Sequence, residues 1–269
     1  MVRSEGETLR RVIVSPPKTE YFRVSDPESH NIEQVADRAK AVEEHRRLCS
    51  LMRRSGARII SLKELAGHPN SVFARDSGLV TAEGYIKLRM GLQTRRGEED
   101  WMAAALESLG IPCAGEIRPP GTVEGGDVIL AGEVTFVGQS ERTNASGIKQ
   151  LSRLLKAMGY EVRVVILPPP HLHIGGAMSL VGPKSVLCCR DLFPGGFFSG
   201  FKTISISCSH FVSGNVICLA DKEVIVEQKN RTAAKALRDD GYKVHALNLS
   251  EFVKGRGGPT CLILPVDRR

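Results

Sequence analysis

Residues 257–266 read GGPTCLILPV, and the apolar run Cys261–Val266 predicts a β-strand close to the C-terminus. This strand belongs to no repeating unit of its own. Ahead of it, a pattern of strand, turn, strand, helix and strand occurs four times. The units begin near residues 72, 123, 171 and 214, which are 43 to 51 residues apart. Since the N-terminal segment supplies only a strand, a helix and a strand, we expect the C-terminal strand to complete its sheet and close a ring.

The predicted fold is α/β, with five strand-strand-helix-strand units around a central channel in a single domain over residues 1–269. Apolar spacing and capping residues place helices at 31–56, 98–109, 144–158 and 232–240, and short strands at 71–73, 78–81 and 85–90. The alternative is an open doubly wound sheet, which needs a glycine-rich phosphate loop after its first strand. That strand, residues 11–15, runs instead into Pro16-Pro17, which favours the ring.

Composition argues against several classes of protein. Hydrophobic residues make up 42% and charged residues 25% of the chain, as in ordinary globular domains. The net charge is +7, but basic residues are dispersed along helices and aromatic residues are only 5%, which disfavours a nucleic-acid-binding protein. No apolar run reaches the roughly 18 residues of a membrane span, and the N-terminus lacks a signal-peptide stretch. We therefore expect a cytoplasmic protein that binds neither nucleic acid nor membrane.

The seven cysteines are odd in number and form no C-x-x-C pair, so we expect reduced thiols and no paired-knuckle zinc site. Cys261 stands apart because the preceding Gly257-Gly258-Pro259-Thr260 forces an irregular approach to its strand, which exposes a thiol. A lone cysteine is more often a small buried residue, so this thiol needs partners before it indicates a nucleophile.

Polar residues recur at equivalent edges of the units, where a ring would turn them towards one channel. They are Asp76, Glu124, Asp127, His171, His173, Asn215 and Cys261. His171 and His173 share one face if their segment is extended. That arrangement suits a metal site with Cys261, an acid-base pair, or plain surface polarity. Arg95 and Arg142 each stand before a helix and offer the fork that grips a carboxylate at two points.

Six segments taken together are far more specific than any one of them. In chain order they are FARD (73–76), RRGE (95–98), TVEGGD (122–127), ERTN (141–144), HLHIGG (171–176) and GGPTC (257–261). Their order and spacing resemble the guanidine-modifying (pentein) superfamily over essentially the whole chain, above all its dimethylarginine dimethylaminohydrolases and amidinotransferase relatives. The resemblance implies a five-bladed α/β propeller, a Cys–His–acid active site, and neither a metal nor an organic cofactor.

The resemblance also implies a role for each residue that matches a family motif. Cys261 is then the nucleophile, His171 the acid and base, and Glu124 the carboxylate that orients the histidine. The substrate-binding residues are Asp76 for the guanidinium, Arg95 and Arg142 for the α-carboxylate, and Asn70 and Phe73 for the pocket wall. Deiminases carry an aspartate two residues after the catalytic histidine; His173 stands there, which favours a methylated substrate. Arg75 is more typical of deiminases, because the hydrolases commonly have glutamate at that position.

The expected activity is hydrolysis of N(ω)-methylated arginines to citrulline and methylamine or dimethylamine through a covalent thiouronium intermediate. Two alternatives use the same site: an arginine deiminase or dihydrolase, and an amidinotransferase that passes the amidino group to an amine. The expected partner is a small guanidino molecule, and the protein is expected to be a monomer or a homodimer. Residues 16–31 are a candidate lid, in which Tyr21 and Phe22 either cover a ligand or pack locally.

Overall fold

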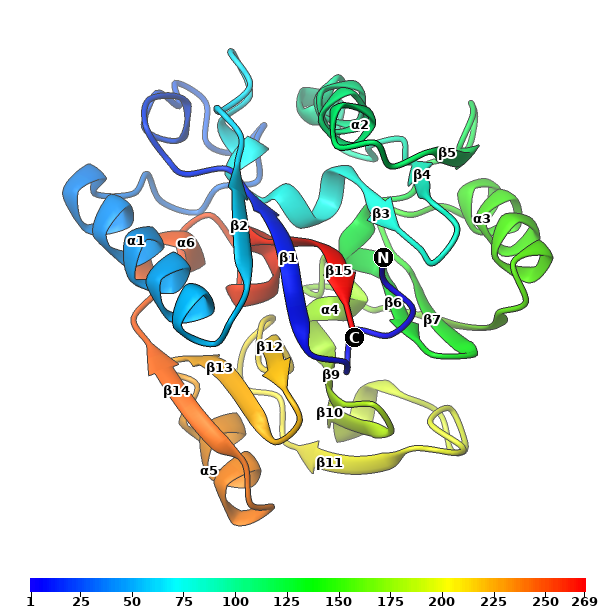
Figure 1. The fold of residues 1–269 in the computed structure, drawn as a ribbon. Helices are drawn as coiled ribbons and strands as arrows, with labels where there is room; N and C mark the ends of the chain where they lie inside the picture. The colour runs from blue at the N-terminus through cyan, green and yellow to red at the C-terminus, as the bar shows by residue number, and fades with distance from the viewer.

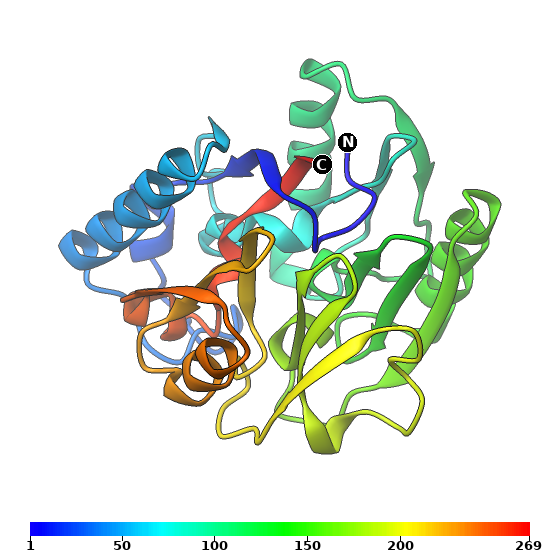
Figure 2. The same ribbon diagram turned by 60° about the horizontal axis from the view of Figure 1, so that its bottom comes forward.

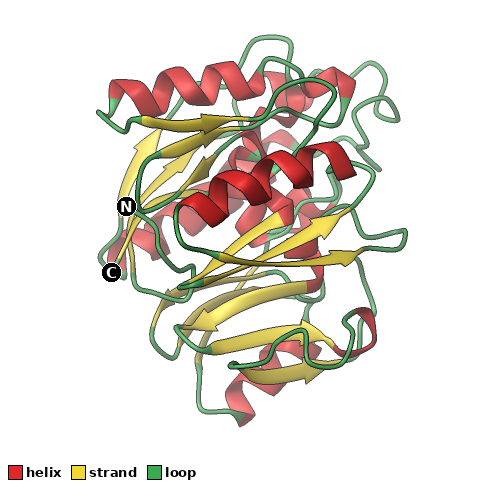
Figure 3. Ribbon diagram, turned by 90° about the vertical axis from the view of Figure 1, so that its right-hand side faces the viewer, coloured by secondary structure: helices red, strands yellow, loops and turns green.

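The computed structural model describes all 269 residues, and its fifteen strands form five three-stranded sheets around a common axis (Figure 1). In every sheet one neighbouring pair of strands is antiparallel and the other is parallel. Three helices, α1 (Arg38–Arg54), α3 (Ala145–Ala157) and α5 (Arg231–Asp239), lie on the outer side of the sheets (Figures 2 and 3). The predicted ring of five α/β units is confirmed.

The first sheet contains β15 (Leu264–Arg268), β1 (Leu9–Val14) and β2 (Arg58–Ser61), in that spatial order. The second contains β3 (Leu79–Val80), β4 (Tyr85–Lys87) and β5 (Cys113–Glu116), and the third β6 (Val128–Ala131), β7 (Val134–Gln139) and β8 (Glu161–Ile166). The fourth contains β9 (Met178–Gly182), β10 (Ser185–Cys189) and β11 (Lys202–Ile206), and the fifth β12 (Val216–Ala220), β13 (Glu223–Glu227) and β14 (Lys243–Leu247). The remaining helices are α2 (Glu98–Ser108), α4 (Ile174–Ala177) and α6 (Ser250–Val253).

The C-terminal strand closes the ring as the sequence predicts. Strand β15 pairs antiparallel with β1, which places Ile13 opposite Leu264 and Val12 opposite Pro265. In Figure 1 the red β15 lies beside the blue β1. Proline is tolerated here because β15 is the edge strand of its sheet. The first and last segments of the chain therefore share one sheet.

Local sequence explains where the longer helices begin and end. Asp37, Asn144 and Asn230 each accept a hydrogen bond from the backbone N–H three residues further on, and so cap α1, α3 and α5. Gly56 (φ 92°) and Gly159 (φ 84°) follow α1 and α3 in the left-handed conformation that ends a helix.

Three expected boundaries are wrong. The first helix begins at Arg38 and not at Asn31, because Asn31 has φ 55° and interrupts the helical backbone. The expected strand at 71–73 is part of a 3₁₀ turn over Pro69–Val72. The expected last strand begins three residues late, because Cys261 belongs to a 3₁₀ turn over Pro259–Leu262. In both turns proline occupies the first position, where its missing N–H costs nothing.

The fourth unit lacks the expected outer helix. A 3₁₀ turn and a loop connect β10 to β11 instead. Aromatic side chains of this loop take the place of a helix, and the ring centre of Phe197 lies 5.3 Å from that of Phe136 on β7. The repeat therefore keeps its spacing along the chain even in the unit where a loop takes the place of the helix.

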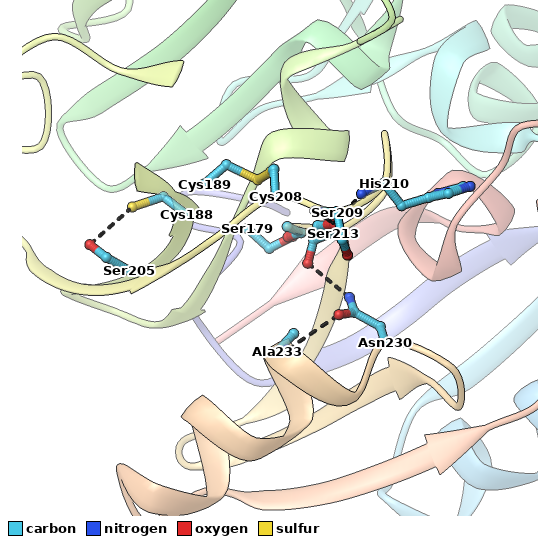
Figure 4. Close-up of a disulfide and its surroundings, with 11 residues drawn as sticks. Ser179, Cys188, Cys189, Ser205, Cys208, Ser209, His210, Ser213, Asn230 and Ala233 are labelled. Atoms are coloured by element: carbon cyan, nitrogen blue, oxygen red, sulfur yellow. Dashed lines mark hydrogen bonds between the residues drawn. A yellow bond between two sulfur atoms is a disulfide. The ribbon is translucent and has the colours of Figure 1, made fainter. Parts of the chain in front are cut away.

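Cys189, at the end of β10, forms a disulfide with Cys208, which follows β11 (Figure 4). The expectation that all the cysteines are reduced is wrong for this pair. Their spacing along the chain gives no sign of the bond, which arises because β10 and β11 run parallel and bring the two residues to one end. Cys188 remains a free thiol, with its sulfur 4.0 Å from the Ser205 hydroxyl.

Apolar side chains from the strands and helices form the interior of the ring, and Leu264 is only 2% exposed within it. No helix in this chain combines the length and the apolar character needed to cross a membrane.

We expect Leu264→Ala to lower the free energy of unfolding by about 2–5 kcal/mol, because it opens a cavity where β15 meets the core. Urea denaturation measures the loss. Val42→Ala is the matched control, since Val42 is 44% exposed on α1 and its truncation should change stability by less than about 0.5 kcal/mol. Equal losses at the two positions would contradict a closing role for β15.

Candidate active site

The polar residues singled out from the sequence gather because each precedes the innermost strand of its unit. Asp76 lies three residues before β3, Glu124 four before β6, and Cys261 three before β15. Asn215 directly precedes β12 and His173 lies five residues before β9. Since these strands are related by the repeat, the residues before them meet at one end of the channel.

The centre of the group is a pair formed by Glu124 and His173. The Nε2 of His173 lies 2.8 Å from Oε2 of Glu124, and its Nδ1 lies 3.7 Å from Oδ1 of Asp76. The other Glu124 oxygen accepts hydrogen bonds from the backbone N–H groups of Gly91 and Leu92, at 3.0 and 3.1 Å. The carboxylate is fully buried, so these donors fix both its position and its charge.

Electrostatics favour the protonated form of this histidine. Burial alone would lower the pKa of His173, but Asp76, Asp127 and the hydrogen bond to Glu124 raise it to about 9. Burial would likewise raise the pKa of Glu124, yet His173, Arg142 and Arg95 hold it below its ordinary value. At neutral pH the pair is therefore imidazolium and carboxylate, and the histidine is ready to act as an acid.

His171, the histidine expected to contact Glu124, does not do so. Its backbone N–H donates to Pro168 O at 3.2 Å, so the segment turns where an extended strand was expected. Its Nδ1 is buried without a hydrogen-bond partner, and burial lowers its pKa. The sequence held a sign of this outcome, because His171 lies seven residues before β9 and the other polar residues lie closer to their strands.

Cys261 offers a thiol to the same space. Its sulfur is 3.4 Å from the backbone N of Gly258 and 3.8 Å from Nδ2 of Asn215. Burial and then the Asp76 charge raise the pKa of the thiol to about 11, while the Gly258 N–H, Arg75 and Arg95 act in the opposite direction. The thiol is therefore protonated at neutral pH unless a further positive charge enters the site.

Only one of the two carboxylate oxygens of Asp76 accepts a hydrogen bond. Its Oδ2 accepts a hydrogen bond from Nη1 of Arg95 at 2.6 Å, whereas the buried Oδ1 has no hydrogen-bond partner. The Oδ1 lies close to the backbone of Gly126, where an added Cβ would stand 2.6 Å from it and 2.8 Å from the His173 ring. Only glycine allows the Glu124 loop to approach this closely.

The structure places Arg95 differently from Arg142. Arg95 is 2% exposed, and its three nitrogens donate to Asp76, to Glu98 and to the backbone oxygens of Asn70 and Phe73. It has no donor nitrogen left for a substrate carboxylate. Arg142 uses only Nη1, at 3.5 Å from both oxygens of Glu124.

A small cavity of about 30 Å³ lies over Cys261, and Asn70, Phe73, Asp76 and Arg142 line it. This volume holds about one water molecule. His30 and Asn31, at the end of the candidate lid, lie on the same wall. Tyr21 does not line the cavity, since it is 2% exposed and stacks on Phe252.

Arg256 connects two segments at the edge of this cavity, one containing Asn31 and the other Pro170. Its Nη1 donates to Asn31 Oδ1 at 3.0 Å and its Nη2 to Pro170 O at 2.9 Å. Its guanidinium carbon lies 5.0 Å from the centre of the Phe211 ring. Entry of a larger ligand therefore requires the segments that Arg256 joins to move apart.

One group of side chains has the geometry of a metal site. The donor atoms of Asp76, Glu124 and His173 lie within 4.8 Å of one another, whereas the metal set considered from the sequence, His171, His173 and Cys261, is not assembled. A raised pKa at His173 opposes metal binding, because a protonated imidazole has no lone pair to donate.

Comparison with known protein families gives two matches. Residues 21–195 match the family of eukaryotic N,N-dimethylarginine dimethylhydrolases, and residues 207–268 match the arginine deiminases. A dimethylarginine dimethylaminohydrolase from Pseudomonas aeruginosa is 29% identical over 85% of this chain and 89% of its own length. Its counterpart from Streptomyces coelicolor is 29% identical over 72% of this chain and 73% of its own length.

Solved structures agree with these matches. A Cys-to-Ser variant of the Pseudomonas aeruginosa enzyme, complexed with citrulline, superposes with a TM-score of 0.84 at 26% identity and covers 96% of this chain and 99% of its own. The N-terminal domain of an arginine dihydrolase from cyanobacteria has a TM-score of 0.84 at 22% identity, over 97% of this chain and 98% of its own, and shares the fold.

We expect the His173 imidazole to titrate near pH 9, and Glu124→Gln to lower that pKa by at least about 1 unit, because the variant removes a carboxylate from the imidazolium. NMR titration measures both values, with the resonance assigned by its absence in His173→Asn. Glu161→Gln, at an exposed position on β8, is the control and should leave the His173 pKa unchanged. A wild-type His173 that titrates near its ordinary 6.5 would contradict the buried carboxylate cluster.

Proposed function

We propose, since this chain belongs to the N,N-dimethylarginine dimethylhydrolase family, that it hydrolyses the guanidinium group of N(ω)-methylated arginines. The products are citrulline and methylamine or dimethylamine. The residues proposed to carry the reaction are Cys261 as nucleophile, His173 as acid and base, Glu124 as its orienting carboxylate and Asp76 as the guanidinium acceptor.

The observation that carries the proposal is the buried Oδ1 of Asp76, which accepts no hydrogen bond and has Nδ1 of His173 only at 3.7 Å. A buried carboxylate oxygen without a donor is costly, and a guanidinium N–H satisfies it with a charge-assisted hydrogen bond. Cys261 and His173 line the same cavity, so a guanidinium held there lies beside both a thiol and an acid. Cation recognition and nucleophilic attack thus require the same small space.

A methylated substrate suits the number of acceptors in the site. Methyl groups replace N–H donors, so fewer carboxylates are needed around the guanidinium. Measured from His173, the position two residues on, where deiminases carry an aspartate, is Gly175. No second carboxylate is therefore supplied by this segment.

Arg142 is the better candidate for the substrate's α-carboxylate. It lines the cavity and keeps two nitrogens without an acceptor in this chain, whereas Arg95 is fully engaged. Arg95 instead holds Asp76 in position through the hydrogen bond from its Nη1 to Oδ2 of Asp76.

The first half of the reaction forms a covalent intermediate. A cationic substrate against Asp76 offsets the charge that raises the pKa of Cys261, and so favours the thiolate, whose proton is lost to solvent because His173 is already protonated. The thiolate attacks the guanidinium carbon and gives a tetrahedral adduct. The His173 imidazolium then donates its proton to the departing amine as the C–N bond breaks, which leaves an S-alkylthiouronium on Cys261.

The second half restores the enzyme. His173, now neutral, removes a proton from water, and the hydroxide adds to the thiouronium carbon. The C–S bond breaks, the hydroxyl proton of the adduct is lost to solvent, citrulline leaves, and the Cys261 thiolate is regenerated beside the imidazolium. Glu124 keeps the ring oriented and stabilises its cation in both halves.

Unmethylated arginine is the second candidate substrate. The match of residues 207–268 to arginine deiminases favours it, as does Arg75 in the FARD segment. The catalytic residues and their order of action would be the same, with ammonia as the leaving group.

Incubation with asymmetric dimethylarginine, monomethylarginine and arginine, followed by mass spectrometry, identifies the substrate. We expect citrulline from the methylated substrates. Cys261→Ser should lower the rate at least about 1,000-fold, and His173→Asn at least about 100-fold, because each removes a group that changes bonding or protonation in the reaction. His171→Asn is the control and should stay within a few-fold of wild type. A large loss at His171 with none at His173 would reverse their proposed roles.

Binding is measured separately by calorimetry of asymmetric dimethylarginine to the Cys261→Ser protein. We expect Asp76→Asn in this background to weaken binding at least about 10-fold, because the amide carries no charge to pair with the guanidinium. Asp239→Asn, on the exposed side of α5, is the matched control. Equal affinities for all three proteins would remove Asp76 from guanidinium recognition.

A further inference from the structure

Arg75 is buried, and all three nitrogens of its guanidinium donate hydrogen bonds. The residue is 5% exposed. Its Nε donates to Gly125 O at 3.1 Å and its Nη2 to Val128 O at 2.6 Å. Both terminal nitrogens also donate to Glu5, at 3.0 and 2.6 Å. The proposed reaction uses neither Arg75 nor Glu5.

Glu5 lies opposite Arg75 because the N-terminal segment is held against strands β6 and β9. Its backbone N–H donates to the carbonyl oxygen of Leu130, at 2.8 Å, and Ser4 forms an antiparallel β-bridge with Ala131. Leu130 and Ala131 both belong to β6. Gly6 passes so close to β9 that an added Cβ would lie 2.0 Å from Gly182 O. The carboxylate facing Arg75 is therefore part of the rigid structure.

Arg75 separates two small spaces along the channel. On one side it lines a cavity of about 20 Å³ together with Gly126, His173 and Cys261. On the other side it lines a cavity of about 10 Å³ with Glu5. The cationic member of the Arg75–Glu5 pair thus lines the same cavity as Cys261, and Glu5 does not line that cavity.

We propose that Arg75, held by Glu5, is a positioning residue of this site that acts in two ways. Its hydrogen bonds to Gly125 and Val128 fix the loop that carries Glu124, and its charge stabilises the thiolate form of Cys261. The inference rests on the proposed function for its purpose, but the thiol chemistry it describes is independent of any substrate.

Other titratable and charged groups around Cys261 do not replace the stabilisation of the thiolate by Arg75. Those that face the same cavities are His30, Asp76, Arg95, Arg142, His173 and Arg256. Asp76 opposes the thiolate, and Arg95 and His173 add positive charge. Each of these two cations faces at least two carboxylates, Arg95 those of Asp76 and Glu98, and His173 those of Glu124 and Asp76. Arg75 is paired with one carboxylate, that of Glu5.

The test measures the rate of Cys261 alkylation by iodoacetamide against pH in the full-length protein, with the modified cysteine identified by peptide mass spectrometry. We expect Arg75→Gln to raise the thiol pKa by about 1 unit, because it removes a nearby positive charge. Glu5→Gln should lower the thiol pKa, since it leaves the Arg75 charge uncompensated. A purely structural role would move both values in the same direction or not at all.

Two further variants keep the proposal testable if a single change unfolds the protein. Arg75→Lys keeps the charge and should hold the thiol pKa near wild type, although it loses the fork that binds Gly125 and Val128. The Glu5→Gln, Arg75→Gln double variant leaves no unpaired buried charge, and its thiol pKa should lie between those of wild type and Arg75→Gln.

Arg153→Gln, on the outer helix α3, is the control for removal of a cation and should leave the thiol pKa unchanged. Unchanged thiol pKa values in folded Arg75→Gln or in the double variant would overturn the proposal. If the shifts appear but no guanidino compound is hydrolysed, only the proposed function fails.

Discussion

Pairing of β15 with β1 determines where every other part of this molecule lies. Each sheet places its innermost strand at the axis, and the residue that precedes that strand points to one end of the channel. Four sheets can do this from contiguous sequence. The fifth needs a strand from the other terminus, and that strand follows the turn that carries Cys261. Ring closure and assembly of the site are therefore one structural event, because an open ring would hold Asp76, Glu124 and His173 without a thiol beside them.

Apolar and charged side chains both line the channel at this end, so the buried charges must neutralise one another. Burial of a charge is costly unless a partner of opposite sign is within contact distance. The structure meets this requirement with short pairs: Arg75 with Glu5, Arg95 with Asp76 and Glu98, and His173 with Glu124. Among the carboxylates of these pairs, only the Oδ1 of Asp76 accepts no hydrogen bond. The network thus permits charges in the interior, and in the proposed function it also leaves a place for another cation.

The sequence was sufficient for the ring and insufficient for the contacts inside it. The repeat spacing and the apolar run at Cys261–Val266 predicted five sheets and their closure, since both depend on periodicity. The acid-base role was expected at His171 because of its position in the HLHIGG segment, and the motif does not show that His173 is the histidine that contacts Glu124. Arg95 was assigned to a substrate carboxylate because spacing does not reveal that Asp76 and Glu98 already use its donors. The Cys189–Cys208 bond depends on two parallel strands meeting, which no local pattern encodes.

The pKa values of Cys261 and His173, about 11 and about 9, describe a resting site in which the thiol is protonated and therefore not nucleophilic, whereas the histidine already carries the proton that it donates. Asp76 contributes to both values, because it disfavours the thiolate and favours the imidazolium. A guanidinium that pairs with Asp76 weakens the first of these effects at the moment of binding. The protonated histidine, still held by Glu124, is then placed to donate to the leaving amine. In the proposed reaction, selection of a cation and activation of the nucleophile therefore depend on the same interaction with Asp76, and the raised pKa of the thiol disfavours the thiolate until a positively charged ligand occupies the cavity.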